Sequence, residues 1–274
     1  MRVVKGVLDR GFEVLEFLAA EARWQRLSDI AVRLELPKGP THRMLTQLSN
    51  LGWVEQDKST GHYRLTLKMS LLGQQYLHGT GLPNLIQPIL DEVARACREL
   101  VRLTVAQGHE LSWLAYSQGA APGLMYRPAM TGRINVYATA NGKAWLATMG
   151  NEDAVRIALR AGLGKKGRSG ARAIGTVDAL LADLDTIRAR GYGTAIEEAE
   201  LGVTVVAVAI RSHSTARVVG TTSIAGPMQR VTSARFEEFH RLLRRAADQL
   251  GAIWPRTEGE REETTKWTAY ASEA

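Results

Sequence analysis

Between Lys38 and Asn50 the chain carries many hydrogen-bonding side chains and no acidic one. Guanidinium, imidazole, hydroxyl and amide groups read base edges in the DNA major groove, and a segment without carboxylates can approach phosphates without repulsion. Further basic groups follow within twenty residues. The side chains concerned are Thr41, His42, Arg43, Thr46, Gln47 and Asn50, then Lys58, His62, Arg64 and Lys68. This chemistry indicates recognition of double-stranded DNA.

Two short helices joined by a tight turn would position these groups. Ser28 is expected to cap the first helix, whose apolar positions Ile30, Ala31 and Leu34 have helical spacing. Residues 36–39 (Leu-Pro-Lys-Gly) break the helix, because the residue before a proline is driven out of the helical region. Pro40 suits the first position of the next helix, where its missing N–H costs nothing.

The apolar spacing of the second helix predicts an inner face, and the residues after the helix predict a hairpin. Its inner positions are Met44, Leu45, Leu48 and Leu51, and Gly52 is placed to end it. The turn-forming run 57–61 then separates short strands at 53–56 and 62–67. Together these elements predict a winged helix-turn-helix. The alternative is a packing unit without a ligand, and the local positive charge favours DNA binding over it.

Composition sets broad limits on the protein class. The 274 residues suffice for two domains, and the formal net charge of +7 favours anionic partners. The single cysteine, Cys97, excludes an intrachain disulfide and falls in a helical pattern as a small core residue. No apolar run is long enough to span a bilayer, and acidic residues interrupt the apolar N-terminal stretch. We therefore expect a cytoplasmic protein.

The second half of the chain mixes strands and helices without a strict βαβ rhythm, which predicts an α+β fold. Gly79, Gly81 and Pro83 interrupt the helical pattern that runs from Leu67 to Leu77. We expect domains at 1–78, with the linker helix, and at 79–254, and a disordered tail at 255–274. Strands are expected at 101–107, 111–117, 203–211 and 218–225. Helices are expected at 85–99, 140–149, 152–161, 177–190 and 234–253.

Enzyme and metal signals are weak. Residues 162–167 match GxGxxG, but they follow a helical pattern and lead into a loop, whereas a dinucleotide fingerprint follows a strand. A basic surface loop at 162–172 is the better interpretation. No catalytic motif appears, and the six histidines are scattered without ligand spacing. We predict no catalytic residues, no metal and no cofactor.

With these residues in place, the chain resembles the IclR family of transcriptional regulators. LPKGPTHRMLTQLSNLGWVEQDKSTGHYRLTLKMSLLG is similar to the family pattern LPKSTVHRLLxxLxxxGYLxxDxxTGxYRLGxxLLxLG. TGRINVYATANGKAWLA, RGYGTAIEEAELGVTVVAVAI and VVGTTSIAGP follow in the family's order, so the resemblance covers residues 5–254. It implies a GAF-like C-terminal domain that binds a small effector, and a dimer or dimer of dimers.

The resemblance also implies which residues contact DNA. Gly39 and Pro40 replace a serine and a threonine of the pattern, which removes two hydroxyl donors at the start of the recognition helix. Arg43 would read a guanine or clamp a phosphate. His62 would reach the minor groove or, more simply, face solvent. Groove contacts are expected from Thr41, His42, Arg43, Thr46 and Gln47, and phosphate contacts from Lys38, Lys58 and Arg64.

For the effector pocket the resemblance implies three segments and a cover. They supply Ala140 and Asn141, Val203 and Val205, and Ser223 and Ala225, with Tyr126 and Met130 in the covering segment. The Asn141 amide would point inward to bind a carboxylate or hydroxyl, or outward at a helix start. Glu197, Glu198 and Glu200 are expected to form a solvated acidic turn, with the pocket mouth as the alternative.

These observations predict a sequence-specific regulator of a catabolic operon. Its partners would be double-stranded operator DNA, a small organic acid and further copies of itself, with no membrane. Aromatic or short-chain acids are the expected effectors. The alternative is a small-molecule-binding protein or enzyme with an interaction module that does not bind DNA.

Overall fold

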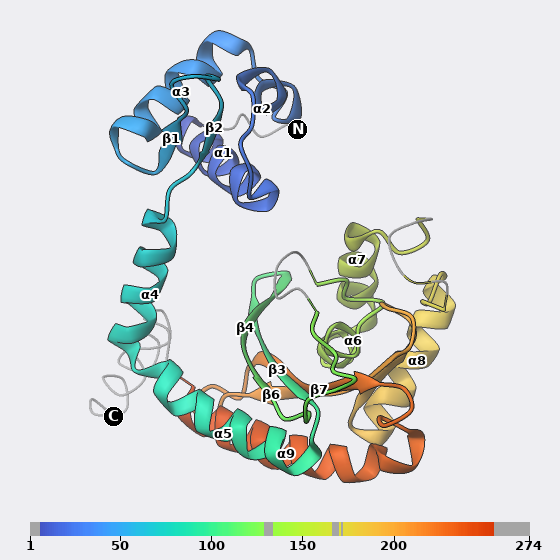
Figure 1. The fold of residues 1–274 in the computed structure, drawn as a ribbon. Coiled ribbons are helices and arrows are strands. Elements are labelled where there is room, and N and C mark those ends of the chain that lie inside the picture. Colours follow the sequence, from blue (N-terminus) through green and yellow to red (C-terminus); the bar gives the residue numbers. More distant parts are fainter. Residues whose placement is uncertain (1–5, 129–133, 166–169, 171, 255–274) are drawn as a thin grey trace, which may run out of the picture. The chain divides into compact units, whose positions relative to one another are not determined.

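The computed structural model describes residues 6–128, 134–165, 170 and 172–254 (Figure 1). The chain forms two compact units, which meet in sequence between Thr80 and Gly81. The predicted tail at 255–274, Met130 and part of the basic loop at 162–172 lie outside the described residues.

The first unit is a three-helix core with a hairpin. Its elements are α1 (Val7–Glu21), α2 (Leu27–Arg33), α3 (Lys38–Asn50), β1 (Val54–Gln56), β2 (Tyr63–Leu65) and α4 (Lys68–Thr80). The strands pair antiparallel, and Gln25 forms a further bridge to Tyr63. An apolar cluster holds α1, α2, α3 and the two strands together, whereas α4 has no buried residue. Its buried members are Val14, Leu15, Leu18, Ile30, Leu45, Val54 and Tyr63. The predicted winged helix-turn-helix arrangement is confirmed.

Three local predictions in this unit were wrong. Arg26, not Ser28, is the N-cap of α2, and the Ser28 hydroxyl donates to Asp29 instead. α3 begins at Lys38, so Pro40 is its third residue, still in the first turn where a missing N–H is tolerated. Leu51 is 59% exposed, because the helix ends before it and turns away from the core. Gly52 does follow the helix in a left-handed conformation, with φ of 76°.

The second unit is built on a five-stranded antiparallel sheet. Its strands are β3 (Leu100–Gln107), β4 (Glu110–Gln118), β5 (Gly193–Ile196), β6 (Val203–Arg211) and β7 (Val218–Pro227), in the order β4-β3-β7-β6-β5. All neighbours are antiparallel. The α+β prediction is confirmed, and the four long strands lie within a few residues of their predicted positions. β5 was missed because four residues that begin with glycine carry too little pattern.

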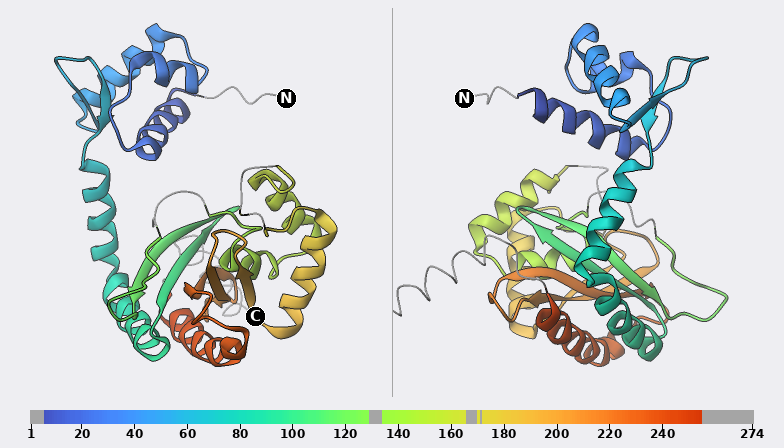
Figure 2. Two further views of the ribbon diagram at one scale, coloured as in Figure 1. Left: turned by 45° about the vertical axis from the view of Figure 1, so that its right-hand side comes forward. Right: turned by 90° about the vertical axis from the view of Figure 1, so that its left-hand side faces the viewer.

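Helices cover both faces of the sheet (Figures 1 and 2). α5 (Leu82–Cys97) and α9 (Phe236–Ile253), which a short 3-10 turn at Ser233–Arg235 precedes, pack on one face. α6 (Ala140–Leu146) packs on the other, and α8 (Val177–Arg190) and α7 (Asn151–Ala161) extend that layer. α5 begins three residues earlier than predicted, because Pro83 is accommodated in its first turn.

The two faces of the sheet differ in composition. The face toward α5 and α9 is a continuous apolar core that includes Leu103, Val206, Ile224 and Phe239. Cys97 belongs to this core, and burial raises the pKa of its thiol to about 11, which makes it unreactive. The face toward α6 carries small apolar residues and several buried polar ones. α6 lies close to it: a Cβ on Gly193 would come within 2.8 Å of the Ala140 carbonyl oxygen.

Candidate nucleic-acid interface and ligand pocket

The outer face of α3 is exposed along its length. His42, Arg43, Thr46 and Gln47 are all exposed, as are the residues that begin the helix, Lys38, Gly39 and Pro40. Among the described residues, the Arg43 side chain has no hydrogen-bond or ion-pair partner, so its five donors are available. The inner side of the same helix is anchored by the fully buried Leu45. A rigid helix therefore presents mobile polar side chains outward.

Thr41 does not belong to this face, and the expected base contact from it is wrong. Its side chain is fully buried, and its hydroxyl donates to the Pro37 carbonyl at 2.9 Å. The hydroxyl thus holds the first turn of α3 to the residue that caps it. Thr46, one turn further, is exposed; its hydroxyl donates to the His42 carbonyl and keeps its lone pairs for a donor from outside.

The hairpin tip is ordered by Asp57. Its carboxylate accepts hydrogen bonds from the backbone N–H groups of Ser59 and Thr60 and from the Ser59 hydroxyl. These bonds, that of the Ser59 hydroxyl first, lower the pKa of Asp57 to about 2. Lys58 is exposed in this turn, and His62 is half-buried at its end. The turn therefore holds Lys58 at the tip.

Two other cations, Arg64 on β2 and Lys68 at the start of α4, are engaged within the unit. Arg64 pairs across the strands with Glu55 at 2.5 Å and stacks on Trp24, 4.4 Å from the ring centroid. Lys68 donates to the Leu51 carbonyl at 2.6 Å. The sequence predicted a phosphate contact for Arg64 but did not reveal Glu55 as its partner. The strand register shows this partner, because Glu55 and Arg64 are paired across the hairpin. A phosphate would have to compete with this exposed pair.

The second unit brings the predicted pocket residues together. Ala140, Val205 and Ala225 are buried in one apolar cluster, and Tyr126 and Val203 pack against it. Ser223 is fully buried two residues before Ala225 on β7. These positions are far apart in sequence, and they converge where α6 lies on β6 and β7.

Asn141 points inward, which decides between the two alternatives for this residue. It is fully buried, and its Nδ2 donates to the Thr221 hydroxyl at 2.9 Å. The Thr221 hydroxyl also lies 2.7 Å from that of Thr104 on the neighbouring strand. No described residue donates to Asn141 Oδ1 or bonds Ser223 Oγ. The pocket therefore contains polar atoms whose bonding capacity is unused.

Arg102 is the residue that sequence reasoning missed. It lies on β3, is only 6% exposed, and has no described partner for its Nε. Its guanidinium lies 4.2 Å from the centroid of the Trp113 ring and 5.7 Å from that of Tyr126. The signal was present: an arginine interrupts the otherwise apolar start of the strand, LVRLTVAQ.

The acidic turn before β6 is solvated only in part: Glu197 is buried and Glu198 half-buried, whereas Glu200 is exposed as predicted. Glu197 is 7% exposed, accepts from the Gly202 N–H and pairs with Arg172 at 2.5 Å. Glu198 binds the buried Lys143 Nζ at 2.7 Å, and burial raises the pKa of its carboxyl despite that cation. Glu200 accepts from the Tyr126 hydroxyl at 2.9 Å. Lys143 explains the inward position of Glu198, because a buried cation needs an acidic partner.

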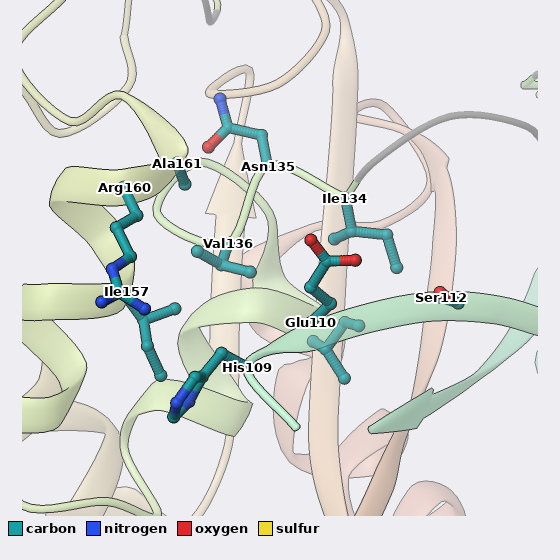
Figure 3. Close-up of a pocket in the computed structure, with 10 residues that line it drawn as sticks. His109, Glu110, Ser112, Ile134, Asn135, Val136, Ile157, Arg160 and Ala161 are labelled. Carbon is teal, nitrogen blue, oxygen red and sulfur yellow. The ribbon is translucent and has the colours of Figure 1, made fainter. Parts of the chain in front are cut away.

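The second unit contains several cavities, of which two differ in their relation to the predicted pocket. One of ≈ 400 Å³ lies between α7 and the turn that joins β3 to β4, with His109, Glu110 and Arg160 among its lining residues (Figure 3). The other, of ≈ 270 Å³, is lined by Leu100, Tyr116, Gln118 and Tyr126, on the sheet face that carries Arg102. Only the second adjoins the predicted pocket.

The weak enzyme signals gain nothing from the structure. The GxGxxG match follows α7 and not a strand, so it lacks the context of a dinucleotide site. Within the described ranges, no group of three or more metal-ligating side chains is close enough to hold an ion. None of the helices described there is long and apolar enough to cross a membrane.

Both units match one protein family. The helix-turn-helix domain of IclR matches residues 7–58, and the C-terminal domain of the bacterial transcriptional regulator IclR matches residues 74–252. The chain belongs to the IclR family. It is 29% identical over 244 residues to the transcriptional repressor IclR of Escherichia coli K12, covering 89% of this chain and 88% of the relative. This IclR-family protein is therefore a transcriptional regulator with a DNA-binding domain, and not an enzyme.

Solved structures share its fold. A putative IclR regulator from a Silicibacter species superposes with a TM-score of 0.79 at 21% identity, covering 93% of this chain and 99% of that one. An IclR homologue from Microbacterium hydrocarbonoxydans, complexed with 4-hydroxybenzoate, gives a TM-score of 0.70 at 26% identity, covering 90% and 98%.

Proposed function

We propose that this IclR-family regulator is a repressor that binds operator DNA as a dimer or dimer of dimers in the cytoplasm. α3 lies in the major groove, and the hairpin contacts the adjacent backbone. The exposed, carboxylate-free face of α3 is the observation that carries the proposal. The E. coli relatives IclR and AllR are both named repressors.

The second unit is proposed as the sensor of a small organic acid, with a catabolic operon as the regulated target. Its pocket combines small apolar walls with buried polar atoms that lack partners. The homologue bound to 4-hydroxybenzoate supports an acid as the ligand class. Effector binding to one arrangement of the oligomer would shift the population toward it, with a coupling of about 1–3 kcal/mol.

DNA binding is tested by fluorescence anisotropy with the full-length protein and the DNA upstream of its own coding sequence. The proposal expects a preference of at least about 10³-fold over shuffled DNA of the same composition at physiological salt. Equal affinity for both would contradict it and would favour an interaction module that does not bind DNA.

Arg43→Ala and Lys58→Ala separate the two kinds of DNA contact. If Arg43 reads a base, its loss costs about 1–3 kcal/mol on the cognate site and little on shuffled DNA. Lys58→Ala should weaken both by a similar factor and reduce the salt dependence. A uniform loss for Arg43→Ala would assign Arg43 to phosphate.

A further inference from the structure

Arg102 is a buried cation without a direct counter-charge. Among the described residues, no carboxylate pairs with it, and its Nε has no acceptor. The Tyr126 side chain interacts with the guanidinium, and the Glu200 carboxylate acts on it from further away while it accepts from the Tyr126 hydroxyl. A buried charge costs several kcal/mol unless it is paired and hydrogen-bonded. Two aromatic rings offset part of that cost and hold the guanidinium in place.

The strand register aligns Arg102 with a second group that lacks a partner. Arg102 on β3 is directly opposite Ser223 on β7, and side chains so paired lie on the same face of the sheet. The Ser223 hydroxyl is fully buried and has no described partner. One side-chain position further along β7, Thr221 holds the Asn141 amide through Nδ2 and leaves Asn141 Oδ1 unpartnered. Two groups that can donate, Arg102 and Ser223, and one that can accept, Asn141 Oδ1, therefore lie in a row along one face of the sheet.

The residues around this row would fit a ligand whose main part is small and apolar. Ala140, Ala144, Ala207 and Ala225 form the buried wall beside it, with side chains no larger than a methyl group. A cavity of ≈ 270 Å³ lies on the same face, lined by Leu100 and Tyr126 but not by Arg102, Ser223 or Asn141. Tyr126 connects the cavity to the row, because it packs against the wall and its ring centroid lies 5.7 Å from the Arg102 guanidinium. The volume of the cavity is just below the range of ligand sites, about 300–1,000 Å³. A small molecule with one anionic end fits the chemistry.

We infer that Arg102 and Ser223 bind the carboxylate of the effector and that Asn141 Oδ1 accepts a hydroxyl hydrogen bond from it. The ligand class is thus a compact hydroxycarboxylic acid. A guanidinium binds a carboxylate through paired N–H donors, and Asn141 has only its acceptor left. This inference rests on the proposed function of the second unit as the sensor, and it names the groups and the ligand chemistry of that sensor.

Calorimetric titration of the full-length protein tests this with three probes: 4-hydroxybenzoate, its neutral analogue 4-hydroxybenzamide, and benzoate. The wild type should prefer 4-hydroxybenzoate to the amide by about 10- to 100-fold. It should prefer 4-hydroxybenzoate to benzoate by a smaller factor. Arg102→Gln should remove the first preference, and Asn141→Leu the second.

Two further variants keep the test decisive. Ser223→Ala removes a hydroxyl that has no described partner, so it should fold normally and weaken binding of 4-hydroxybenzoate about 5- to 10-fold. Arg160→Gln is the matched control, since Arg160 lines the other cavity (Figure 3). It should leave every affinity unchanged.

Three outcomes would overturn the inference. The first is no binding of 4-hydroxybenzoate at millimolar concentration. The second is a preference for the carboxylate over the amide that survives both Arg102→Gln and Ser223→Ala, and the third is loss of that preference in the control variant Arg160→Gln. Operator binding is measured on the same samples without ligand. Retained operator preference without binding of 4-hydroxybenzoate defeats this inference and leaves the proposed DNA binding standing. Loss of operator preference in the wild type defeats the proposed function instead.

Discussion

The two proposed binding regions of this protein carry their polar side chains in opposite environments. On α3, His42, Arg43 and Gln47 are exposed and held only through the helix that carries them. On the inner sheet face, Arg102, Ser223 and Asn141 are nearly or fully buried, and each keeps an atom without a partner. A long polyanion can be met by a convex surface, whereas a small molecule gains affinity only where water is excluded.

The difference also separates stability from function. An exposed side chain that contacts only an external partner can be removed at little cost to folding. A buried polar group without a partner is itself a cost, so removing it leaves the fold unharmed or improves it. The following predictions test this contrast, from the largest expected effect to the smallest.

Leu45→Ala should lower the free energy of unfolding of the first unit by about 2–5 kcal/mol, because Leu45 is fully buried in its core. Gln47→Ala, on the exposed side of the same helix, should change it by about 0.5 kcal/mol or less while weakening operator binding. Urea unfolding followed by circular dichroism measures both. Similar losses of stability would refute the division of α3 into two faces.

Thr221→Val should destabilise the second unit by about 1–3 kcal/mol, because the Thr221 hydroxyl contacts both Thr104 and Asn141 inside the sheet face. Ser223→Ala, two residues away, should leave the melting temperature unchanged or raise it. Thermal denaturation compares the two. A clear loss for Ser223→Ala would mean that its hydroxyl is satisfied in the free protein.

Thr41→Val should cost about 1 kcal/mol of stability through the lost bond to Pro37, with operator preference unchanged. Thr46→Val should do the reverse, with a small stability change and weaker operator binding. Unfolding and anisotropy measurements on both variants decide this. A changed operator preference for Thr41→Val would restore Thr41 to the recognition face.

Gly39→Ala should raise stability by about 0.4–1 kcal/mol, since a Cβ there meets nothing within 4 Å and the residue is helical. Gly52→Ala, at φ of +76°, should lower it instead. Melting temperatures measure both changes. If Gly39→Ala also weakens operator binding, the backbone itself approaches the DNA at this position.

Prediction from sequence succeeded where the signal was local. The helical spacing around Leu45, the break at Pro37 and the alternation along the long strands each depend on neighbours in the chain, so the winged motif and most of the sheet were predictable. It failed for Thr41, whose small polar side chain suits either face of a helix, and it could not show that Arg64 has an acidic partner across the hairpin.

The sequence by itself determined the family, the α+β class and the polar outer face of α3, because short-range periodicity and motif order suffice for each. Only the tertiary structure decided that Arg102, Ser223 and Asn141 gather on one face of the sheet. They come from β3, β7 and α6, and strand register and helix docking bring them together. No local pattern encodes which buried polar atoms are left without partners, since that depends on every neighbour at once.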